Sequence, residues 1–265
     1  MLKIENVCKT FNAGTVNEKK ALRNLNLHLK PGEFVTVIGG NGAGKSTMLN
    51  ATAGVFSVES GKIMIDGIDV THLPEYKRAK YIGRVFQDPM MGTAANMWIE
   101  ENLALAARRG KPRTLRTGIT NKEREYYKEQ LKILDLGLED RMTAKVGLLS
   151  GGQRQALTLL MATLQKPKLL LLDEHTAALD PKTAAKVLEA TQRIVSKDNL
   201  TTLMITHNMR DAIAYGNRLI MMYDGKIVVD VSGEEKKHLT VEQLLNLFSQ
   251  ASGSDEADDK LLLSK

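Results

Sequence analysis

Hydrophobic and polar positions alternate over the first part of the chain. The runs at residues 2–7 and 21–29 both alternate, and a polar stretch around Gly14 separates them, which predicts two antiparallel strands. The segment "PGEFVTVIGG" then predicts a turn, a buried strand and a glycine loop, and "KSTMLNATAGV" predicts a helix. A further hairpin is predicted at "GKIMIDGIDV". The chain therefore starts with antiparallel strands and continues with a strand, a loop and a helix.

The middle of the chain has helical spacing. This spacing follows a short strand, "YIGRVFQDP", which Pro89 ends, and it runs from about Met90 to Leu164 with one break at the basic loop "RRGKPRTLRTG". Buried strands return at "KLLLLDEH" and "LTTLMITHN", with helices at "PKTAAKVLEATQRIVSKD" and "MRDAIAYG" and a hairpin at "RLIMMYDGKIVVD". Because alternating strands and helices favour a mostly parallel sheet covered on both faces, we predict an α/β fold with an inserted helical block.

The last part of the chain passes from an apolar, helical pattern to a polar, acidic one. The segment "VEQLLNLFSQ" predicts a last helix, and the polar, acidic "ASGSDEADDK" predicts a disordered tail.

A chain of 265 residues is long enough for one large domain or two modest lobes. Apolar residues make up 43% and charged residues 26%, an ordinary soluble balance.

Charge and cysteine content narrow the choice only slightly. The formal charge of 37 − 31 = +6 permits nucleic acid, anionic lipid or nucleotide phosphates as partners. The single cysteine, Cys8, cannot form an internal disulfide, which is typical of a reducing cytosol. No stretch resembles a signal peptide, and the longest apolar run, in "KLLLLD", is far below the roughly 20 residues needed to cross a bilayer. We expect a cytosolic chain that reaches a membrane only through a partner.

Residues Gly39–Ser46, "GGNGAGKS", match the phosphate-loop pattern G-x-x-x-x-G-K-[ST] between a predicted strand and a predicted helix. The glycines allow backbone N–H groups to converge on phosphate oxygens, and the helix N-terminus adds partial positive charge. Lys45 supplies a full charge to the outer phosphates, and the Ser46 hydroxyl suits Mg²⁺. The alternative is a glycine turn followed by a chance Lys-Ser pair, which the flanking elements disfavour.

The buried strand at Lys168–Glu174 ends in two acids. Open α/β sheets bind ligands at the carboxyl ends of their strands, so these acids are expected at the site. Asp173 suits Mg²⁺, through water, and Glu174 is the candidate general base for an attacking water. The alternative, in which Glu174 only precedes a helix, is the weaker one beside a complete phosphate loop.

A second glycine-rich segment, "LLSGGQRQALTLL" at residues 148–160, resembles a phosphate loop without its lysine. Ser150 could cap the helix that follows, and Gly151 and Gly152 expose the backbone.

Together these motifs resemble the nucleotide-binding subunit of ATP-binding-cassette (ABC) transporters. The similarity extends from Phe11 to about Asp230, and "LSGGQ" is its specific part, because a phosphate loop alone is common to many NTPases. The motifs occur in the order that the family has: Gly39–Ser46, Gln87, Leu149–Gln153, "LLLLDE", Ala178–Asp180 and His207.

The resemblance implies an α/β fold of the P-loop NTPase (RecA-like) type, with a mixed-sheet core, an N-terminal antiparallel β subdomain and an inserted α-helical subdomain. It implies one ABC ATPase domain over residues 1–265. Within it, residues 1–88 and 165–232 form the nucleotide-binding core with the β subdomain, and residues 89–164 form the helical subdomain. Residues 233–265 form a C-terminal helix and a disordered tail.

The resemblance also implies roles. Phe11 would stack on adenine, Gln87 would touch Mg²⁺ and the attacking water, and His207 would contact the γ-phosphate. Taken alone, each could be an ordinary strand-end residue. The implied catalytic residues are Glu174, His207, Gln87 and Lys45, and the implied metal ligands are Ser46, Gln87 and Asp173. The implied nucleotide contacts are Phe11, Gly39, Gly40, Asn41, Gly42, Ala43, Gly44, Lys45, Ser46, Thr47, Ser150, Gly151, Gly152, Gln153 and Asp180.

In the family a homodimer sandwiches two ATP molecules head to tail. Asp180 would cap the next helix before Pro181 and reach the partner subunit. ATP and Mg²⁺ are the implied cofactors. The implied partners are a second copy, integral membrane permease subunits and a lipoprotein-type or extracellular binding protein, with the chain at the cytoplasmic face of the cell membrane. The permease would dock near Gln87, at Asp88, Pro89, Met90 and Met91, unless the methionines are core residues.

Some positions depart from the family pattern. His175 stands where Pro is usual and Ala178 where Ser is frequent, and Ala156 and Met161 replace common arginines. These changes indicate a distinct subgroup, similar to importers of amino-acid-type solutes. The basic loop Arg108–Arg116 is either a solvated loop, which is the favoured interpretation, or a contact for lipid head groups or for an acidic partner surface.

Three other functions stay open. A soluble ABC ATPase acting on nucleic acid or ribosomes fits the basic pI, although one cassette, one cysteine and no heptad run disfavour it, and nucleic acid is an unlikely partner. An exporter subunit is possible on the same motifs. A small-molecule kinase is disfavoured by "LSGGQ" and His207.

Overall fold

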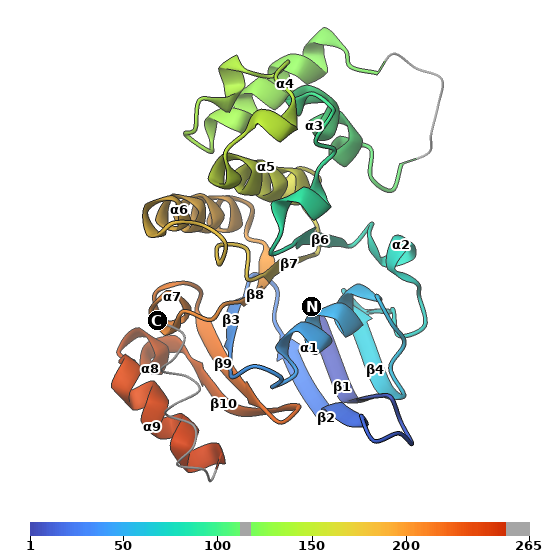
Figure 1. The fold of residues 1–265 in the computed structure, drawn as a ribbon, viewed down its shortest axis with the longest axis vertical. Coiled ribbons are helices and arrows are strands. Elements are labelled where there is room, and N and C mark those ends of the chain that lie inside the picture. The colour runs from blue at the N-terminus through green and yellow to red at the C-terminus, as the bar shows by residue number, and fades with distance from the viewer. Residues whose placement is uncertain (112–117, 253–265) are drawn as a thin grey trace.

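A computed structural model describes residues 1–111 and 118–252. In Figure 1 a helical block lies at the top of the molecule, and a sheet runs from it to the lower end, where a separate antiparallel sheet lies beside it. The segment at residues 251–260 that the sequence predicts to be disordered starts with two residues that continue the last helix, and the rest of it lies outside the described residues, as does most of the basic loop at 108–116.

The first sheet is antiparallel, as the alternating pattern predicts. Its strand order is β2-β1-β4-β5. Leu2 and Ile4 point into the core because alternate side chains of a strand face opposite sides. Val7 reaches the same core because the register shifts between Ile4 and Val7, where Asn6 has a positive φ of 49°. The strands are β1 (Leu2–Phe11), β2 (Lys19–Leu29), β4 (Ser60–Ile65) and β5 (Ile68–Asp69).

The second sheet has the order β10-β9-β3-β8-β7-β6, and only its β9–β10 pair is antiparallel. The carboxyl ends of the parallel strands therefore share one edge. This mixed sheet confirms the predicted α/β fold with a mixed-sheet core. Its strands are β3 (Phe34–Ile38), β6 (Ile82–Val85), β7 (Leu169–Asp173), β8 (Thr201–Ile205), β9 (Arg218–Tyr223) and β10 (Lys226–Ser232).

Apolar side chains of β7 pack on both faces of this sheet. Leu170 and Leu172 join a core formed with helices α5 and α6, whereas Leu169 and Leu171 join a core formed with α1 and the antiparallel sheet. This double burial explains why the strand is a continuous apolar run. The helices of the core are α1 (Lys45–Ala53), α2 (Glu75–Arg78), α6 (Pro181–Asp198), α7 (Met209–Ala214), α8 (Gly233–Lys237) and α9 (Val241–Ser252).

The helical block packs around Tyr127, Leu131 and Leu157, and the same core continues to α6 and β7. Arg124 of the block forms two hydrogen bonds to the buried carboxylate of Glu100, at 2.7 and 3.1 Å. The elements of the block are the 3₁₀ turns η1 (Pro89–Gly92), η2 (Leu138–Asp140) and η3 (Val146–Leu148), and the helices α3 (Ile99–Ala107), α4 (Asn121–Lys132) and α5 (Gly151–Thr163).

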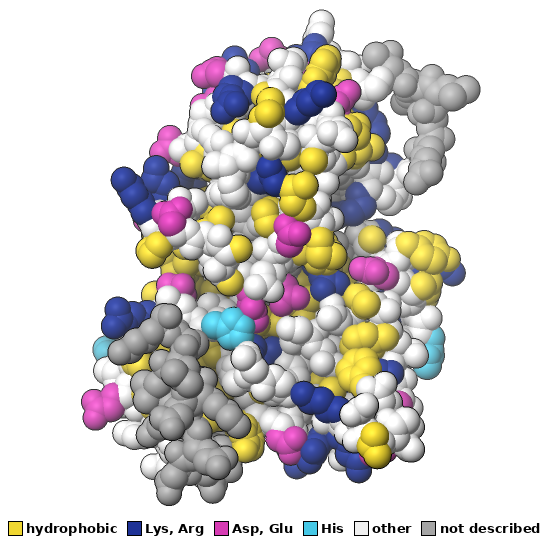
Figure 2. Space-filling model, in the orientation of Figure 1, with side chains coloured by type: hydrophobic (Ala, Val, Ile, Leu, Met, Phe, Trp, Pro, Cys, Tyr) yellow, Lys and Arg dark blue, Asp and Glu magenta, His cyan; other side chains and the backbone are white. Residues whose placement is uncertain are grey.

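On the face drawn in Figure 2, lysine and arginine side chains are interspersed with aspartate and glutamate. No helix among the described residues is both long and apolar enough to span a bilayer.

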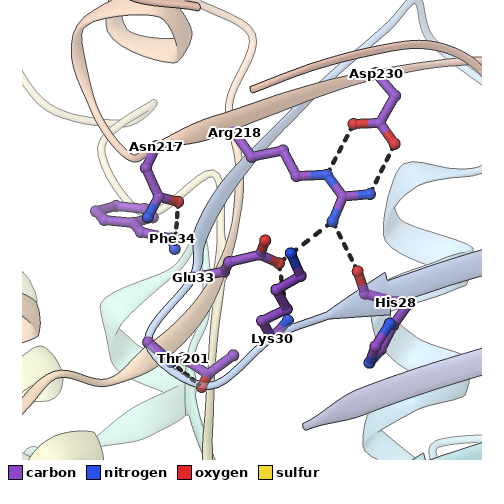
Figure 3. Close-up of polar contacts among 9 residues, drawn as sticks. His28, Lys30, Glu33, Phe34, Thr201, Asn217, Arg218 and Asp230 are labelled. Carbon is purple, nitrogen blue, oxygen red and sulfur yellow. Dashed lines mark hydrogen bonds and ion pairs between the residues drawn. The ribbon is translucent and has the colours of Figure 1, made fainter. Parts of the chain in front are cut away.

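Hydrogen bonds of Arg218 join the two sheets (Figure 3). Its guanidinium donates to both carboxylate oxygens of Asp230, at 2.8 and 2.7 Å, and to the carbonyl of His28 at the end of β2, at 2.7 Å. The same guanidinium lies 3.3 Å from Glu33 Oε2. Since His28 and Arg218 belong to different sheets, this network holds the antiparallel sheet against the mixed sheet.

Arg78 stabilises the end of helix α1. Its side chain is 2% exposed, and its guanidinium donates four hydrogen bonds to backbone carbonyls. Two of the acceptors, Ala51 and Thr52, lie in the last turn of α1, where a cation also complements the helix dipole. The acceptors are the carbonyls of Leu73, Ala51, Thr52 and Thr71.

We expect Arg78→Met to lower the free energy of unfolding by about 3 kcal/mol or more, because it removes the side-chain donor of the carbonyls of Leu73, Thr52 and Thr71, whereas that of Ala51 still accepts from the N–H of Gly54. Urea denaturation of the purified chain measures this loss. Lys77→Met, at the exposed neighbouring position, is the matched control and is expected to change stability by less than about 0.5 kcal/mol. Equal stability of the two variants would contradict the capping role.

Candidate functional site

The phosphate loop connects β3 to α1, as the sequence predicts, and lines a cavity of about 420 Å³. Gly44 precedes the helix with φ of 103°, a left-handed conformation that favours glycine. An added Cβ there would lie 2.6 Å from the carbonyl oxygen of Ala21, so a side chain is also excluded sterically. The predicted residues that line the cavity are Phe11, Asn41, Gly42, Ala43, Gly44, Lys45, Ser46, Thr47, Glu174 and His207.

Lys45 lies beneath the loop. Its ammonium donates to the carbonyls of Gly39 and Gly40, at 2.7 and 3.0 Å, and its side chain is almost fully buried. Burial lowers the pKa of Lys45, while the nearby carboxylates of Glu174 and Asp173 raise it. The loop carbonyls and the two acids therefore hold the cation at the floor of the cavity.

Glu174 and His207 meet at the carboxyl edge of the sheet. His207 Nε2 lies 2.6 Å from Glu174 Oε1. The hydrogen bond to His207 is the main cause of a lowered Glu174 pKa, against the opposing effect of burial. Glu174 is therefore an ionised carboxylate at neutral pH and can accept a proton. Its backbone has φ of 47°, a strained conformation for a residue with a side chain.

Asp173 faces Arg84, with 3.7 Å between its Oδ2 and the guanidinium. Burial raises the pKa of Asp173 and the Arg84 charge lowers it. Asp173 also lies close enough to Lys45 for the two charges to influence each other.

The structure does not bring every predicted residue to this cavity. Gln87 is exposed and does not line it. The "LSGGQ" residues Ser150, Gly151, Gly152 and Gln153 lie at the start of α5, outside the cavity lining. Ser150 caps that helix, with its hydroxyl accepting from the N–H of Gln153 at 3.3 Å, as predicted. Asp180 caps α6 by accepting from the N–H of Thr183 at 3.1 Å, also as predicted.

Sequence reasoning missed three residues near the site. Lys19 and Ala21 line the cavity because β2 pairs with β1 in a register that places Lys19 opposite Phe11. His175, noted only as a departure from the family, is 2% exposed, and burial lowers its pKa to about 4. The pattern of apolar and polar residues around Lys19 does not show how β2 pairs with β1, so the position of Lys19 could not be predicted. His175 could have been singled out, because it directly follows the candidate base in sequence.

A model of the family described as "ABC transporter" matches residues 22–177. The chain is 46% identical over 251 residues to the tyrosine transport ATP-binding protein of Clostridioides difficile, which covers 95% of this chain and 100% of that protein. It is 35% identical over 232 residues to the methionine import ATP-binding protein MetN of Bartonella henselae. That match covers 86% of this chain and 64% of the relative, so the chain spans less than two thirds of that protein.

Among solved structures, the chain is similar to the ATP-binding cassette MJ0796 in a dimeric, post-hydrolysis state bound to ADP and Pi. The TM-score is 0.74 at 33% sequence identity, and the match covers 88% of this chain and 98% of that one.

Proposed function

Because the chain belongs to the ABC transporter family of ATP-binding proteins, whose members hydrolyse ATP to drive transport, we propose that it is the ATPase subunit of an importer. In this proposal two copies close head to tail around two ATP molecules, and separate membrane subunits carry a small solute. The main support for this proposal is the following arrangement of residues. Lys45, Glu174 and His207 meet in one cavity, and the "LSGGQ" residues lie outside that cavity in the same chain.

A head-to-tail dimer explains this separation. The start of α5 presents Ser150, Gly151 and backbone N–H groups but no lysine, so alone it would bind phosphate weakly. It would add contacts to a phosphate that a second copy of the chain already binds with Lys45. ATP then stabilises the dimer because it binds the closed form best, and hydrolysis removes that stabilisation.

Mg²⁺ is the proposed metal. The Ser46 hydroxyl lines the cavity, and the Asp173 carboxylate lies near the Lys45 ammonium at its floor, so hard oxygen donors of the kind that Mg²⁺ prefers are present. We propose that Ser46, Asp173 and Gln87 are the residues that would hold the ion, Asp173 through a water molecule. When bound, the ion would neutralise charge on the phosphate oxygens.

Glu174 acts as the general base in this proposal. Its carboxylate is ionised, partly buried and oriented by His207. His207 is the residue that would turn to the γ-phosphate once a nucleotide separates it from Glu174. Phe11, at the edge of the cavity, would stack on adenine, and the backbone of Gly39–Thr47 would bind the phosphates.

Docking of the permease is proposed at a second cavity of about 380 Å³ between the core and the helical block. Phe86, Leu105 and Met161 line it, and Gly92 of the turn η1 borders it. Met90 and Met91 of that turn are 45% and 69% exposed, so they are surface residues and available to a partner rather than core residues. A cavity at this place supports the proposed division of the chain, in which residues 89–164 form the helical subdomain and residues 1–88 and 165–232 form the core.

Import of an amino-acid-type solute is proposed because the relatives named above are a tyrosine transport and a methionine import protein. A binding protein outside the cell would supply the solute, and the chain would act at the cytoplasmic face of the membrane. The nucleic-acid alternative lacks support on the face drawn in Figure 2, where acidic residues are interspersed with the basic ones.

Affinity purification from native membranes tests the proposed assembly. The wild-type chain is expected to retain one defined permease, identified by mass spectrometry, and to transport only with it in liposomes. Leu105→Glu places a charge in the second cavity at a position that is already 56% exposed. This variant is expected to lose the permease and to keep its ATP affinity. Salt-sensitive nucleic-acid binding with stimulated ATPase, and no permease, would favour the soluble alternative.

A further inference from the structure

The buried imidazole of His175 connects the turn that carries Glu174 to helix α6. His175 is 2% exposed and Thr191, on α6, is 1% exposed. His175 Nε2 lies 3.1 Å from Thr191 Oγ1. This side-chain hydrogen bond spans 16 residues of sequence and joins the residue after the candidate base to the middle of the longest helix of the core.

The hydrogen-bond network determines which ring nitrogen carries the hydrogen. Thr191 Oγ1 donates its one hydrogen to the carbonyl of Val187, at 2.8 Å. The hydroxyl can therefore only accept from His175, so Nε2 is protonated and Nδ1 is not. His175 Nδ1 is buried and has no hydrogen-bond partner among the described residues. An imidazole here thus leaves a buried acceptor unsatisfied, which costs folding free energy that an apolar side chain would not cost.

The turn that His175 anchors contains a strained residue. Two backbone hydrogen bonds lie within the turn, and Leu179 packs against the core of the helical block and α6. Glu174 has φ of 47° and its N–H donates to the carbonyl of Ile205, at 3.1 Å. The next side-chain anchor is Asp180, whose carboxylate caps α6. Thr191 lies 11 residues beyond Asp180, which corresponds to about 16 Å along the helix. Two side-chain hydrogen bonds therefore join residues 174–180 to α6, and the one made by His175 is adjacent to Glu174.

We propose that His175 is a positioning residue for hydrolysis, which holds the Glu174 turn against α6 through its hydrogen bond to Thr191. The inference rests on the proposed role of Glu174 as the base. It explains why a residue that is unfavourable for folding occupies this position. Displacement of a catalytic group by about 1 Å can cost about 100-fold in rate, so an anchor next to the base affects turnover even without touching the nucleotide.

The proposal predicts opposite effects on stability and rate. His175→Leu removes the unsatisfied nitrogen, while Thr191 keeps its own bond to Val187. Its urea unfolding midpoint is expected to equal or exceed that of the wild type, and its kcat is expected to fall about 10-fold. The Kd for ATP, measured on dilute monomer, is expected to stay within about twofold. A purely structural role would lower the midpoint and the rate together.

Two conservative variants test the hydrogen bond itself. His175→Gln places an amide N–H at about the distance of Nε2 from the backbone and is expected to keep kcat within about threefold. Thr191→Ser retains the acceptor and is expected to do the same, whereas Thr191→Val is expected to lose as much rate as His175→Leu. The double variant His175→Leu/Thr191→Val is expected to be no slower than either single variant, because both remove the same bond.

Wild-type kcat in His175→Leu, or additive losses in the double variant, would overturn the proposal. Glu174→Gln is measured in parallel to separate the two hypotheses. If that variant hydrolyses ATP normally, Glu174 is not the base and the proposed function is wrong at this residue. If it is inactive while His175→Leu is fully active, only the positioning role of His175 fails.

Discussion

Glu174→Gln is expected to bind ATP normally and to lower its turnover by at least about 100-fold. Glutamine has nearly the shape of glutamate, but it cannot accept a proton from the attacking water, and loss of a general base typically costs 10²–10⁴-fold. The carboxylate that it replaces is ionised because His207 hydrogen bonds to it at 2.6 Å. Steady-state release of phosphate measures the effect. The exposed Glu189→Gln on α6 is the matched control and should retain wild-type turnover.

The same variant is expected to accumulate as a closed dimer. When ATP is bound by both halves of each site and is not hydrolysed, the dimer keeps its stabilisation by the nucleotide. Size-exclusion chromatography with saturating ATP and Mg²⁺ should show a dimer for Glu174→Gln and mostly monomer for the control. Turnover at the wild-type rate would show that Glu174 is not the base.

The parts of the fold that depend on local pattern were predictable. Helix α6 begins at Pro181 after its Asp180 cap, and β7 is a continuous apolar run because both of its faces are buried. The phosphate loop needs only neighbouring glycines and Lys45, so its sequence fixes its shape. Each of these features is visible in a pattern of a few consecutive residues, even where the contacts that explain it are long-range.

The pairing of Glu174 with His207 could not be derived from spacing. The two residues lie 33 positions apart in sequence, and only the parallel pairing of β7 with β8 brings the ends of these strands together. The strand that ends in two acids indicated Glu174 and the resemblance to the family indicated His207, but neither indicated that the two side chains are in contact. Lys19 was missed for a similar reason, since its place in the cavity depends on the β1–β2 register. Long-range register carries little signal in a single sequence.

The "LSGGQ" segment shows a different limit. Its capping by Ser150 is local and was predicted, but the proposed ligand contacts of Gly151 depend on a second chain. A single sequence and a single chain contain only half of such a site. Variants that act across a dimer are therefore the decisive test.

Gly151→Asp is expected to lower the rate of ATP hydrolysis by at least about 100-fold without weakening the binding of ATP to the monomer. A Cβ at Gly151 meets only Leu179 Cδ2, at 3.4 Å, and an acid at a helix N-terminus is favourable, so the variant should fold. In the dimer its carboxylate would face the phosphates held by the partner. Gly152→Ala is the contrast, since its Cβ would lie 2.0 Å from Thr183 Cγ2 and should lower the unfolding midpoint. A large loss of ATP affinity in dilute Gly151→Asp would contradict the cross-subunit role.

Mixing two inactive variants gives the sharpest form of this test. Lys45→Ala lacks a working phosphate loop but keeps its "LSGGQ" segment, and Gly151→Asp has the reverse defect. A mixed dimer contains one site with both halves intact and one site with both halves damaged. ATPase activity should therefore reappear when the two variants are combined, up to about half that of the wild type for each mixed dimer. If both halves of a site belonged to the same chain, the mixture would stay inactive, as it also would if either variant failed to fold. The unfolding midpoints measured for each variant alone separate these two outcomes.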